Sequence, residues 1–335
     1  MRQGRYDFTD LKRWKQAIRA SMGGQVDIAG SAIDERGNAI LFDVTSATAR
    51  DVVSALAARL GVPPGALEVR VVAPHRLAAD LNDRVRPLEG GLMIQTPFTG
   101  GGGGVSYISI CTYGVNATRN GTRYMIMNSH CTQDAQYYGL GGMPTGAATV
   151  YQAQVASSSR IGTEDTDPPF DQNSTACPAG ATCRYSDAAL VQLTTSDAYV
   201  LGGVEGTTGG PNYSSLSGPT TIDPAWHINL AGTISPIVGD SVEKVGRVSG
   251  WTGGTVGSVC YDYEYVYTFG RNVVLCSVGV FAGVQEGDSG SPVFMYYGNE
   301  YWLDGILFGA SAGNDQFFFA KWGDVNTELG GGLSP

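Results

Sequence analysis

From about residue 105 to the end, short runs rich in Val, Ile, Tyr and Thr alternate with clusters of Gly, Asn, Asp and Ser. Runs such as VSYISICTYGV, AALVQL and NVVLCSVGVF have the composition of β-strands, and the clusters that separate them have the composition of turns. Many short strands with few helical stretches between them are typical of an all-β barrel or sandwich. The alternation therefore predicts that residues 105–335 form a mainly β domain.

The first eighty residues follow a different pattern. Residues 7–22 place apolar side chains at helical spacing, and residues 46–60 do so again before Gly61, a residue type that commonly ends helices. The segment SAIDERGNAILFDV predicts a pair of strands, and ALEVRVVA predicts one more. We therefore expect a small α+β domain over residues 1–82.

Between these parts lies LNDRVRPLEGGLMIQTPFTGGGGG, which combines arginines, prolines and a run of glycines. This composition is typical of a flexible connection, so it predicts a Gly/Pro-rich junction over residues 83–104. Exposed junctions of this kind are preferred sites of proteolysis.

The six cysteines all follow residue 105. An even number without the Cys-x-x-Cys spacing of zinc sites favours disulfides and an oxidising compartment. Six cysteines allow 15 pairings, of which the pairing of sequence neighbours is the simplest: Cys111–Cys131, Cys177–Cys183 and Cys260–Cys276. We expect a secreted, extracellular protein whose signal peptide is absent from this sequence, because the first residues lack an apolar central region.

Charge and hydropathy exclude several classes of partner. The formal net charge is −10 and the acidic excess lies in the second part, which argues against nucleic-acid binding. No apolar run approaches the roughly 20 residues of a membrane-spanning helix. We expect no cofactor and no metal site, since His75 and His227 have no ligand partner at useful spacing and are assigned to the surface or the core. A monomer is expected.

The stretch VQEGDSGSPVF places Ser289 between two glycines and after an aspartate. A serine hydroxyl needs a neighbouring base to act as a nucleophile, and the base needs an orienting group. Of the three histidines, His130 follows the apolar run MIMNS and precedes a cysteine. Asp187 stands at the start of the apolar run AALVQL. The order His130, Asp187, Ser289 is one of the known orders of a Ser-His-Asp triad.

The blocks GDSGSP, NSHC and SDAAL resemble the three catalytic blocks of chymotrypsin-like serine peptidases. The segments CTYGVNA and VGRVSGWTGG are similar to strands of the secreted bacterial branch, which includes streptogrisins and alpha-lytic protease. The resemblance covers roughly residues 105–325. It implies two six-stranded antiparallel β-barrels with the triad between them, preceded here by the small α+β domain, and it implies a serine endopeptidase that hydrolyses polypeptides through an acyl-enzyme.

Carried over by motif, Ser289 attacks the carbonyl, His130 transfers the proton and Asp187 orients the imidazole. The N–H groups of Gly287 and Ser289 are implied to form the oxyanion hole. The family holds the carboxylate next to the nucleophile, here Asp288, with an ion pair. We expect Arg247 to be its partner.

The resemblance also places the substrate pocket for the P1 side chain. Gly283 lies six residues before Ser289 where trypsin-like members have an aspartate, so a preference for Arg or Lys is not expected. We expect an apolar pocket narrowed by Leu307 and Val284. The expected walls are Gly283, Val284, Glu286, Leu307, Phe308, Gly309 and Ala310.

Three alternatives remain at this level. The first domain is either a prodomain that aids folding and covers the active site, cut at residues 88–91 or at the Phe98–Thr99 bond, or a permanent accessory domain. The chain is either an active protease or a catalytically silent or latent binding module held by its own N-terminal domain. The same triad also permits esterase activity.

Overall fold

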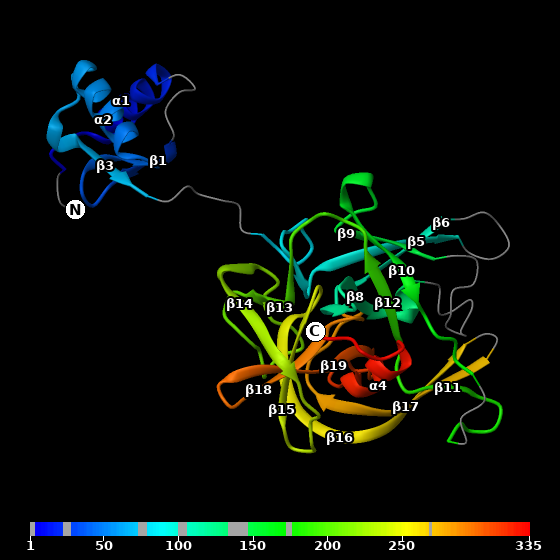
Figure 1. Ribbon diagram of the computed structural model, residues 1–335. Helices are drawn as coiled ribbons and strands as arrows, with labels where there is room; N and C mark the ends of the chain where they lie inside the picture. The colour runs from blue at the N-terminus through cyan, green and yellow to red at the C-terminus, as the bar shows by residue number, and fades with distance from the viewer. Residues whose placement is uncertain are drawn as a thin grey trace. The chain divides into compact units, whose positions relative to one another are not determined.

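The computed structural model describes residues 4–22, 28–72, 79–99, 106–132, 147–171, 176–267 and 270–335. The chain divides into two compact units, Met1–Leu77 and Ala78–Pro335 (Figure 1). His75 lies outside the described residues. No helix in the described ranges is long and apolar enough to cross a membrane.

The first unit has the predicted α+β composition. Its elements are α1 (Phe8–Ser21), β1 (Ile28–Asp34), β2 (Ala39–Val44), α2 (Ala47–Arg59), a 3-10 turn (Pro64–Ala66) and β3 (Leu67–Val71). The three strands form a sheet in the order β1-β2-β3, in which β1 is antiparallel and β3 parallel to β2. Apolar side chains of both helices and of β2 share one core cluster, which gives this unit a hydrophobic core of its own.

The second unit begins with a seven-stranded sheet in the order β6-β5-β9-β10-β12-β8-β7. Six strands were expected here, and β7 adds an edge strand through a tight hairpin at Asn120–Gly121, where both residues have positive φ (52° and 79°). The strands are β5 (Met93–Thr99), β6 (Ser106–Thr112), β7 (Asn116–Arg119), β8 (Thr122–Asn128), β9 (Thr149–Gln152), β10 (Arg160–Thr166) and β12 (Ala188–Leu193).

A larger sheet completes the second unit. Within it, β15, β16, β17, β20, β19 and β18 pair antiparallel in succession and β18 pairs back to β15, so these strands close a six-stranded barrel. The strands of the larger sheet are β4 (Leu88–Gly90), β11 (Thr182–Arg184), β13 (Tyr199–Thr207), β14 (Ile222–Thr233), β15 (Ser241–Gly246), β16 (Gly250–Tyr267), β17 (Gly270–Phe281), β18 (Pro292–Tyr297), β19 (Glu300–Ala310) and β20 (Phe317–Lys321). The predicted mainly β fold is confirmed.

Strands β8 and β12 are buried on both faces, which joins the two sheets. Met125 and Val191 belong to the core of the first sheet, whereas their neighbours Ile126 and Leu190 belong to a cluster shared with strands of the closed barrel. Because side chains alternate along a strand, one pair of strands can serve both clusters. The C-terminal helix α4 (Trp322–Glu328) packs on the shared cluster through its buried Trp322 and Val325.

Residues 83–104 were predicted to be a flexible junction, but residues 88–99 of this segment are folded into the second unit. Leu88, Leu92 and Ile94 are fully buried in the core of the first sheet, and β5 pairs with β6 along its whole length. Glycine and proline content predicted a linker, but the apolar residues between them gain a core once partner strands are present. Residues 100–104 of the predicted junction lie outside the described residues.

The boundary between the two units also lies earlier than predicted. Leu81 is fully buried, and its N–H donates to Thr220 O at 3.0 Å. The Ile222 N–H donates to Ala79 O at 2.8 Å. Residues from Ala79 onward are therefore bound into the second unit, although the sequence assigned residues 79–82 to the first domain.

Candidate active site

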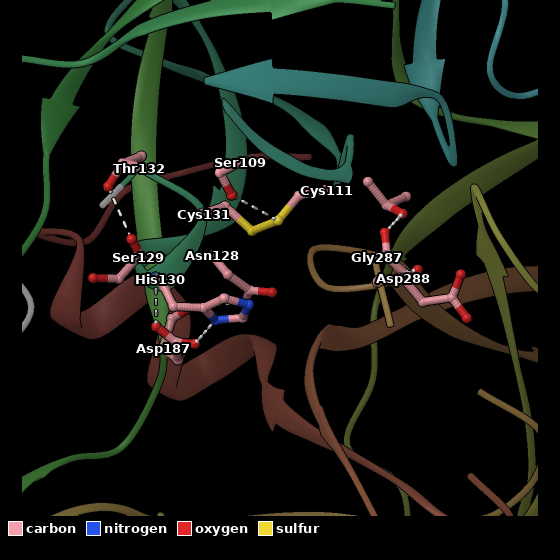
Figure 2. The surroundings of a disulfide bond; sticks show 12 residues. Ser109, Cys111, Asn128, Ser129, His130, Cys131, Thr132, Asp187, Gly287 and Asp288 are labelled. Atoms are coloured by element: carbon pink, nitrogen blue, oxygen red, sulfur yellow. Dashed lines mark hydrogen bonds and ion pairs between the residues drawn. A yellow bond between two sulfur atoms is a disulfide. The ribbon is translucent and has the colours of Figure 1, made fainter. Parts of the chain in front are cut away.

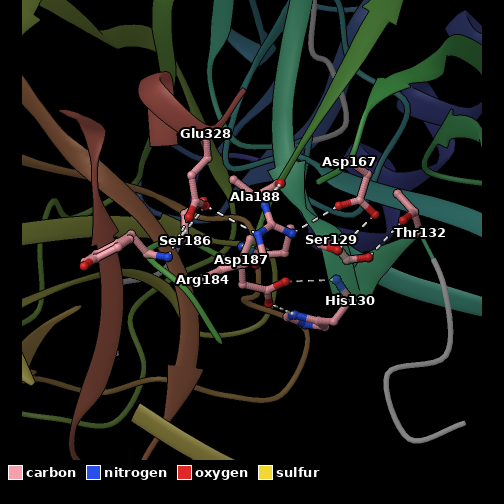
Figure 3. Close-up of polar contacts among 11 residues, drawn as sticks. Ser129, His130, Thr132, Asp167, Arg184, Ser186, Asp187, Ala188 and Glu328 are labelled. Atoms are coloured by element: carbon pink, nitrogen blue, oxygen red, sulfur yellow. Dashed lines mark hydrogen bonds and ion pairs between the residues drawn. The ribbon is translucent and has the colours of Figure 1, made fainter. Parts of the chain in front are cut away.

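The pairing of β8 with β12 brings His130 and Asp187 together. Ala188 is the cross-strand partner of Asn128, so the residues just beyond these two meet at one end of the sheet. His130 lies in a 3-10 turn, η3 (Ser129–Cys131). Its Nδ1–H donates to Asp187 Oδ2, and its backbone N–H donates to Asp187 Oδ1 at 3.2 Å (Figure 3).

The environment of this pair favours the charged imidazole. The Asp187 side chain is 3% exposed and that of His130 is 27% exposed. Burial alone would lower the pKa of His130, but the charge of Asp187 and the hydrogen bond to it outweigh burial, so this pKa is raised above its ordinary value. The hydrogen bond holds a proton on Nδ1 and leaves Nε2 to accept another. The pair has the arrangement of a general base with its orienting carboxylate.

The disulfide Cys111–Cys131 and Thr112 link the turn of Ser289 to the segment that carries His130. Cys111 is bonded to Cys131, the residue after His130. Thr112, the residue after Cys111, donates its N–H to Ser289 O at 2.8 Å and its hydroxyl to Gly287 O at 2.9 Å. Figure 2 shows the disulfide, the His130 pair and this turn in one neighbourhood. Within the described residues no hydrogen bond joins the Ser289 side chain to His130, a contact that often tightens only with substrate bound.

The turn around Ser289 leaves alternate N–H groups unused. The N–H of Asp288 donates to Gln285 O at 3.0 Å, and that of Gly290 donates to Leu307 O at 2.9 Å. Over the described part of the chain, neither the Gly287 N–H nor the Ser289 N–H has an acceptor. Gly287 has φ of 96°, a conformation that L side chains rarely adopt. Two unpaired donors beside a serine can bind an oxyanion.

The carboxylate of Asp288 is held by Lys244. Both side chains are fully buried, and Lys244 Nζ lies 3.1 Å from Asp288 Oδ2. Asp288 also accepts hydrogen bonds from the N–H groups of Val248 at 3.0 Å and Gln285 at 2.9 Å, and from the N–H and hydroxyl of Ser249. Burial alone would raise the pKa of Asp288, but Lys244 and these hydrogen bonds lower it, so the carboxylate stays ionised.

The predicted Arg247–Asp288 ion pair is therefore wrong. Side chains alternate along β15, so Lys244 and Gly246 face the same way. That face points at Asp288, because a Cβ on Gly246 would lie 2.5 Å from Asp288 Oδ1. Arg247 follows the strand, and its backbone N–H donates to Thr112 Oγ1 at 3.1 Å. No local pattern in SVEKVG singles out Lys244, because this strand is buried from Val242 to Gly246 and the neighbouring Glu243 is charged and buried as well.

A buried arginine that the sequence analysis missed supports the η3 turn. Arg184 is 3% exposed in its side chain, and its Nη1 lies 3.3 Å from Asp167 Oδ1. Asp167 in turn accepts a hydrogen bond from the Ser129 hydroxyl at 3.0 Å (Figure 3). Ser129 is the residue before His130, so this chain of contacts fixes the backbone that carries the imidazole.

Helix α4 supports the turn that carries Asp187. Glu328, at its end, accepts hydrogen bonds from the N–H groups of Tyr185 at 2.6 Å and Ser186 at 3.0 Å, and from the Ser186 hydroxyl at 2.5 Å. Arg184 Nε lies 3.4 Å from the same carboxylate. The turn that presents Asp187 is thus anchored to the C-terminal helix, a contact between residues too distant in sequence for a local pattern to reveal.

Four of the seven predicted pocket residues are buried, and the other three are exposed or partly exposed. Val284 and Leu307 are 1% and 2% exposed and belong to the core of the closed barrel, so their side chains do not narrow a pocket as expected. Phe308 is buried in the cluster between the sheets. Glu286 is exposed, and Gly309 and Ala310 are partly exposed. Gly283 is in close contact with Leu216, because a Cβ added to it would lie 2.4 Å from Leu216 Cα.

Tyr263, from β16, covers the strand that carries these residues. Its hydroxyl donates to Ala310 O at 3.2 Å, and its ring meets Phe308 edge-on at 5.3 Å between centroids. A Cβ on Gly309 would lie 2.9 Å from the Tyr263 ring. The aromatic ring thus occupies the space beside Gly309, and no sequence motif indicated it.

All three predicted disulfides are confirmed: Cys111–Cys131, Cys177–Cys183 and Cys260–Cys276. Cys111 and Cys131 also lie close to His130, but their sulfurs are bonded to each other and offer no thiolate to a metal ion.

Comparisons with known proteins found structural similarity only. No family model matches the chain, and no curated protein matches it in sequence. Protease A of Thermobifida fusca is 17% identical with a TM-score of 0.44, over 73% of this chain and 96% of that one. A Nocardiopsis protease is 18% identical with a TM-score of 0.44, over 73% and 97%. The alpha-lytic protease homolog N4 is 20% identical with a TM-score of 0.46, over 74% and 98%.

Proposed function

We propose that this chain is a secreted serine endopeptidase that cleaves polypeptides through an acyl-enzyme. The observation that carries the proposal is the hydrogen bond between Asp187 and His130. Ser289 is linked to the same region, because its carbonyl accepts from Thr112, which follows Cys111, and Cys111 is bonded to Cys131 next to His130. The two unpaired N–H groups of Gly287 and Ser289 add the means to bind a developing negative charge. The three motifs that predicted these residues are far apart in sequence, and the hydrogen bonds of Thr112 to the Ser289 turn support their assignment to one site.

In the proposed mechanism the Ser289 hydroxyl attacks the substrate carbonyl while His130 Nε2 takes the hydroxyl proton. The carbonyl oxygen becomes an oxyanion that accepts hydrogen bonds from Gly287 and Ser289 N–H. His130 then gives its proton to the leaving amine, which departs and leaves an acyl group on Ser289. A water molecule attacks this ester while His130 takes its proton, and His130 then returns that proton to Ser289 Oγ as the carboxylic acid product leaves. Asp187 stabilises the imidazolium in both halves of the reaction.

The proposed substrate has an apolar P1 side chain. Gly283 brings no carboxylate to bind Arg or Lys, and the partly exposed Gly309 and Ala310 are small and uncharged. We add Tyr263 to the residues proposed to shape this region, because its ring lies beside Gly309.

We propose that the first unit is a prodomain removed by cleavage ahead of Ala79. Both processing sites expected from the sequence are integrated into the second unit: residues 88–90 form buried β4, and the Phe98–Thr99 bond lies in β5, paired to β6. A protease needs an accessible, extended segment, which these strands do not offer. The residues between Val72 and Ala79 join the two units and are the proposed site.

The test is intact mass spectrometry of the purified full chain before and after a fluorophosphonate probe. The expected result is one adduct, mapped to Ser289, on a chain that begins between residues 73 and 79. An adduct on the uncut chain would support the protease and reject the prodomain. If no adduct forms on either the full chain or a chain trimmed to Ala79, the protein is not a serine hydrolase. Labelling with ester turnover but no peptide turnover would point to the esterase.

The pH dependence of kcat/KM is a second prediction. We expect activity to fall on the acid side with a midpoint above about 6.5, the ordinary value for histidine, because Asp187 raises the pKa of His130. Below that midpoint His130 is protonated and cannot act as a base. Replacing Asp187 with Asn removes the charge that raises this pKa, so the residual activity should have its acid limb at lower pH. A rate that stays constant from pH 5 to 8 is incompatible with the role given to His130.

Removal of the Cys111–Cys131 disulfide is expected to affect activity beyond its effect on stability. The double variant C111S/C131S opens a loop with a sequence separation of 20, and it should lower the free energy of unfolding by about 3 kcal/mol. It also loosens the link between His130 and the Ser289 turn, so fluorophosphonate labelling of the folded protein should slow. The control C177S/C183S opens a loop with a separation of 6, costs about 2 kcal/mol, and should leave labelling unchanged. Equal labelling rates in the two folded variants would contradict the positioning role.

A further inference from the structure

Three adjacent strands outside the proposed active site place two glutamates and a histidine together. Glu205 of β13 and His227 of β14 are direct cross-strand partners. On the other side of β13, the parallel strand β4 pairs Gly90 with Val204 and carries Glu89. The three side chains share one face, and their ligand atoms all lie within 4.8 Å of one another. Neighbouring strands therefore hold this cluster on the sheet framework.

Both glutamates are buried beside a single cationic group. Glu89 and Glu205 are 2% and 1% exposed in their side chains, whereas His227 is 38% exposed. His227 Nδ1 lies 2.8 Å from Glu89 Oε2 and 3.6 Å from Glu205 Oε2. One imidazole cannot neutralise two carboxylates, so the cluster has an excess of buried negative charge when both are ionised.

Among the residues that the structure describes, neither oxygen of the Glu205 carboxylate has a hydrogen-bond partner. Asp288 shows how this fold holds a buried carboxylate elsewhere, with a lysine and four hydrogen bonds. Glu205 has no lysine and no such hydrogen bonds beside it, only His227 at 3.6 Å, and a buried carboxylate with so little compensation is strongly unfavourable. Burial, together with the charge of Glu89, raises the pKa of Glu205 to about 7. Over the described part of the chain, His227 is the cationic group that faces both glutamates, and its single charge does not balance two carboxylates.

We propose that Glu89, Glu205 and His227 bind one divalent transition-metal ion, with Zn²⁺ the best match. Imidazole nitrogens and carboxylate oxygens are both zinc ligands, with bonds of about 2.0–2.2 Å. Tetrahedral bonds of that length separate ligand atoms by about 3.3 Å. The separations of 2.8 and 3.6 Å from His227 Nδ1 bracket this value, and all three ligand atoms lie within 4.8 Å of one another, so small side-chain movements would complete the site.

The ion would link β4 to the hairpin of β13 and β14. Strand β4 has three residues and pairs in parallel with β13. An ion bound by Glu89 of β4, Glu205 of β13 and His227 of β14 would join β4 to that hairpin in addition to the strand pairing. Because the cluster contains neither His130 nor Ser289, we assign the ion a structural role. Without metal, the same residues would form a Glu89–His227 ion pair beside a protonated Glu205, and the experiment separates these two states.

The experiment measures Zn²⁺ binding to the untagged full chain after chelator treatment and desalting. Isothermal titration should give one ion per chain, and added Zn²⁺ should raise Tm in the wild type. In E205Q and in H227N the affinity should fall at least 100-fold and the Tm response should vanish. H227N changes a partly exposed residue, so it keeps the test valid if E205Q does not fold. Fluorophosphonate labelling of Ser289 should be unaffected in both variants, which separates this test from that of the protease.

The matched control is D304N. Asp304 is also fully buried, neither of its oxygens has a hydrogen-bond partner within the described ranges, and burial raises its pKa to about 8. It belongs to neither of the metal-ligand clusters found among the described residues. D304N should therefore bind Zn²⁺ as the wild type does. The proposal is overturned if the wild type binds no Zn²⁺, or if E205Q and H227N both bind it with wild-type affinity.

Discussion

Replacing Ser289 with alanine is expected to lower kcat/KM for a peptide substrate by roughly 10⁴–10⁶-fold. The variant lacks the oxygen that forms the acyl-enzyme, so covalent catalysis and fluorophosphonate labelling are both lost. The free energy of unfolding should change little, because the contact that anchors this turn uses the backbone carbonyl of Ser289, which alanine retains. Measurements of kcat/KM and of urea unfolding on the same preparation check both parts.

The control for this variant is Ser291→Ala. Ser291 is a second serine of the same turn, and its buried hydroxyl donates to Asp288 O at 2.5 Å. Its loss should cost about 1 kcal/mol of stability but should leave labelling of Ser289 in place. If Ser289→Ala turned over peptides at the wild-type rate, the assignment of the nucleophile would be wrong. If Ser291→Ala alone abolished labelling, the nucleophile would be Ser291.

Replacing Lys244 with methionine should lower the free energy of unfolding by about 3–5 kcal/mol and should abolish labelling of Ser289. Methionine keeps most of the volume of the side chain but leaves the buried carboxylate of Asp288 without a counter-charge. That carboxylate organises the turn from Gln285 to Ser289, which carries the two unpaired N–H groups. Urea unfolding and the rate of fluorophosphonate labelling measure the two effects.

Two further variants distinguish Lys244 from Arg247. Arg247→Ala removes a charge that makes no ion pair with Asp288, so it should be tolerated far better than Lys244→Met. The double variant Lys244→Met/Asp288→Asn removes both charges and should be less destabilised than the sum of the two single variants. A stable, reactive Lys244→Met protein together with an inactive Arg247→Ala protein would restore the original assignment.

Local sequence patterns predicted most of the secondary structure and singled out His130, Asp187 and Ser289 as candidates. The helices of the first unit follow apolar spacing, and the strands of the second follow alternation between turn clusters. His130, Asp187 and Ser289 each stand in a short motif, because each of them must lie in a turn of defined shape beside a strand. The disulfides followed from neighbour pairing, since each joins cysteines that are close in sequence.

The residues that pair with buried charges could be identified only from the tertiary structure. Arg247 and Lys244 are three residues apart, and only the direction in which β15 presents them decides which one meets Asp288. Residues 88–99 resembled a linker because their glycines and prolines are local signals, whereas the strands that bury them come from elsewhere in the chain.

The sequence by itself determined that this chain builds a small α+β unit before a disulfide-bonded β unit, and which serine, histidine and aspartate to examine. The tertiary structure decided where the second unit begins, which lysine holds the turn around Ser289, and that Glu89, Glu205 and His227 converge. The physical reason is the range of the interactions. Backbone propensity and side-chain alternation act over a few residues, but compensating a buried charge depends on groups brought together by strand pairing over as many as 138 residues of sequence.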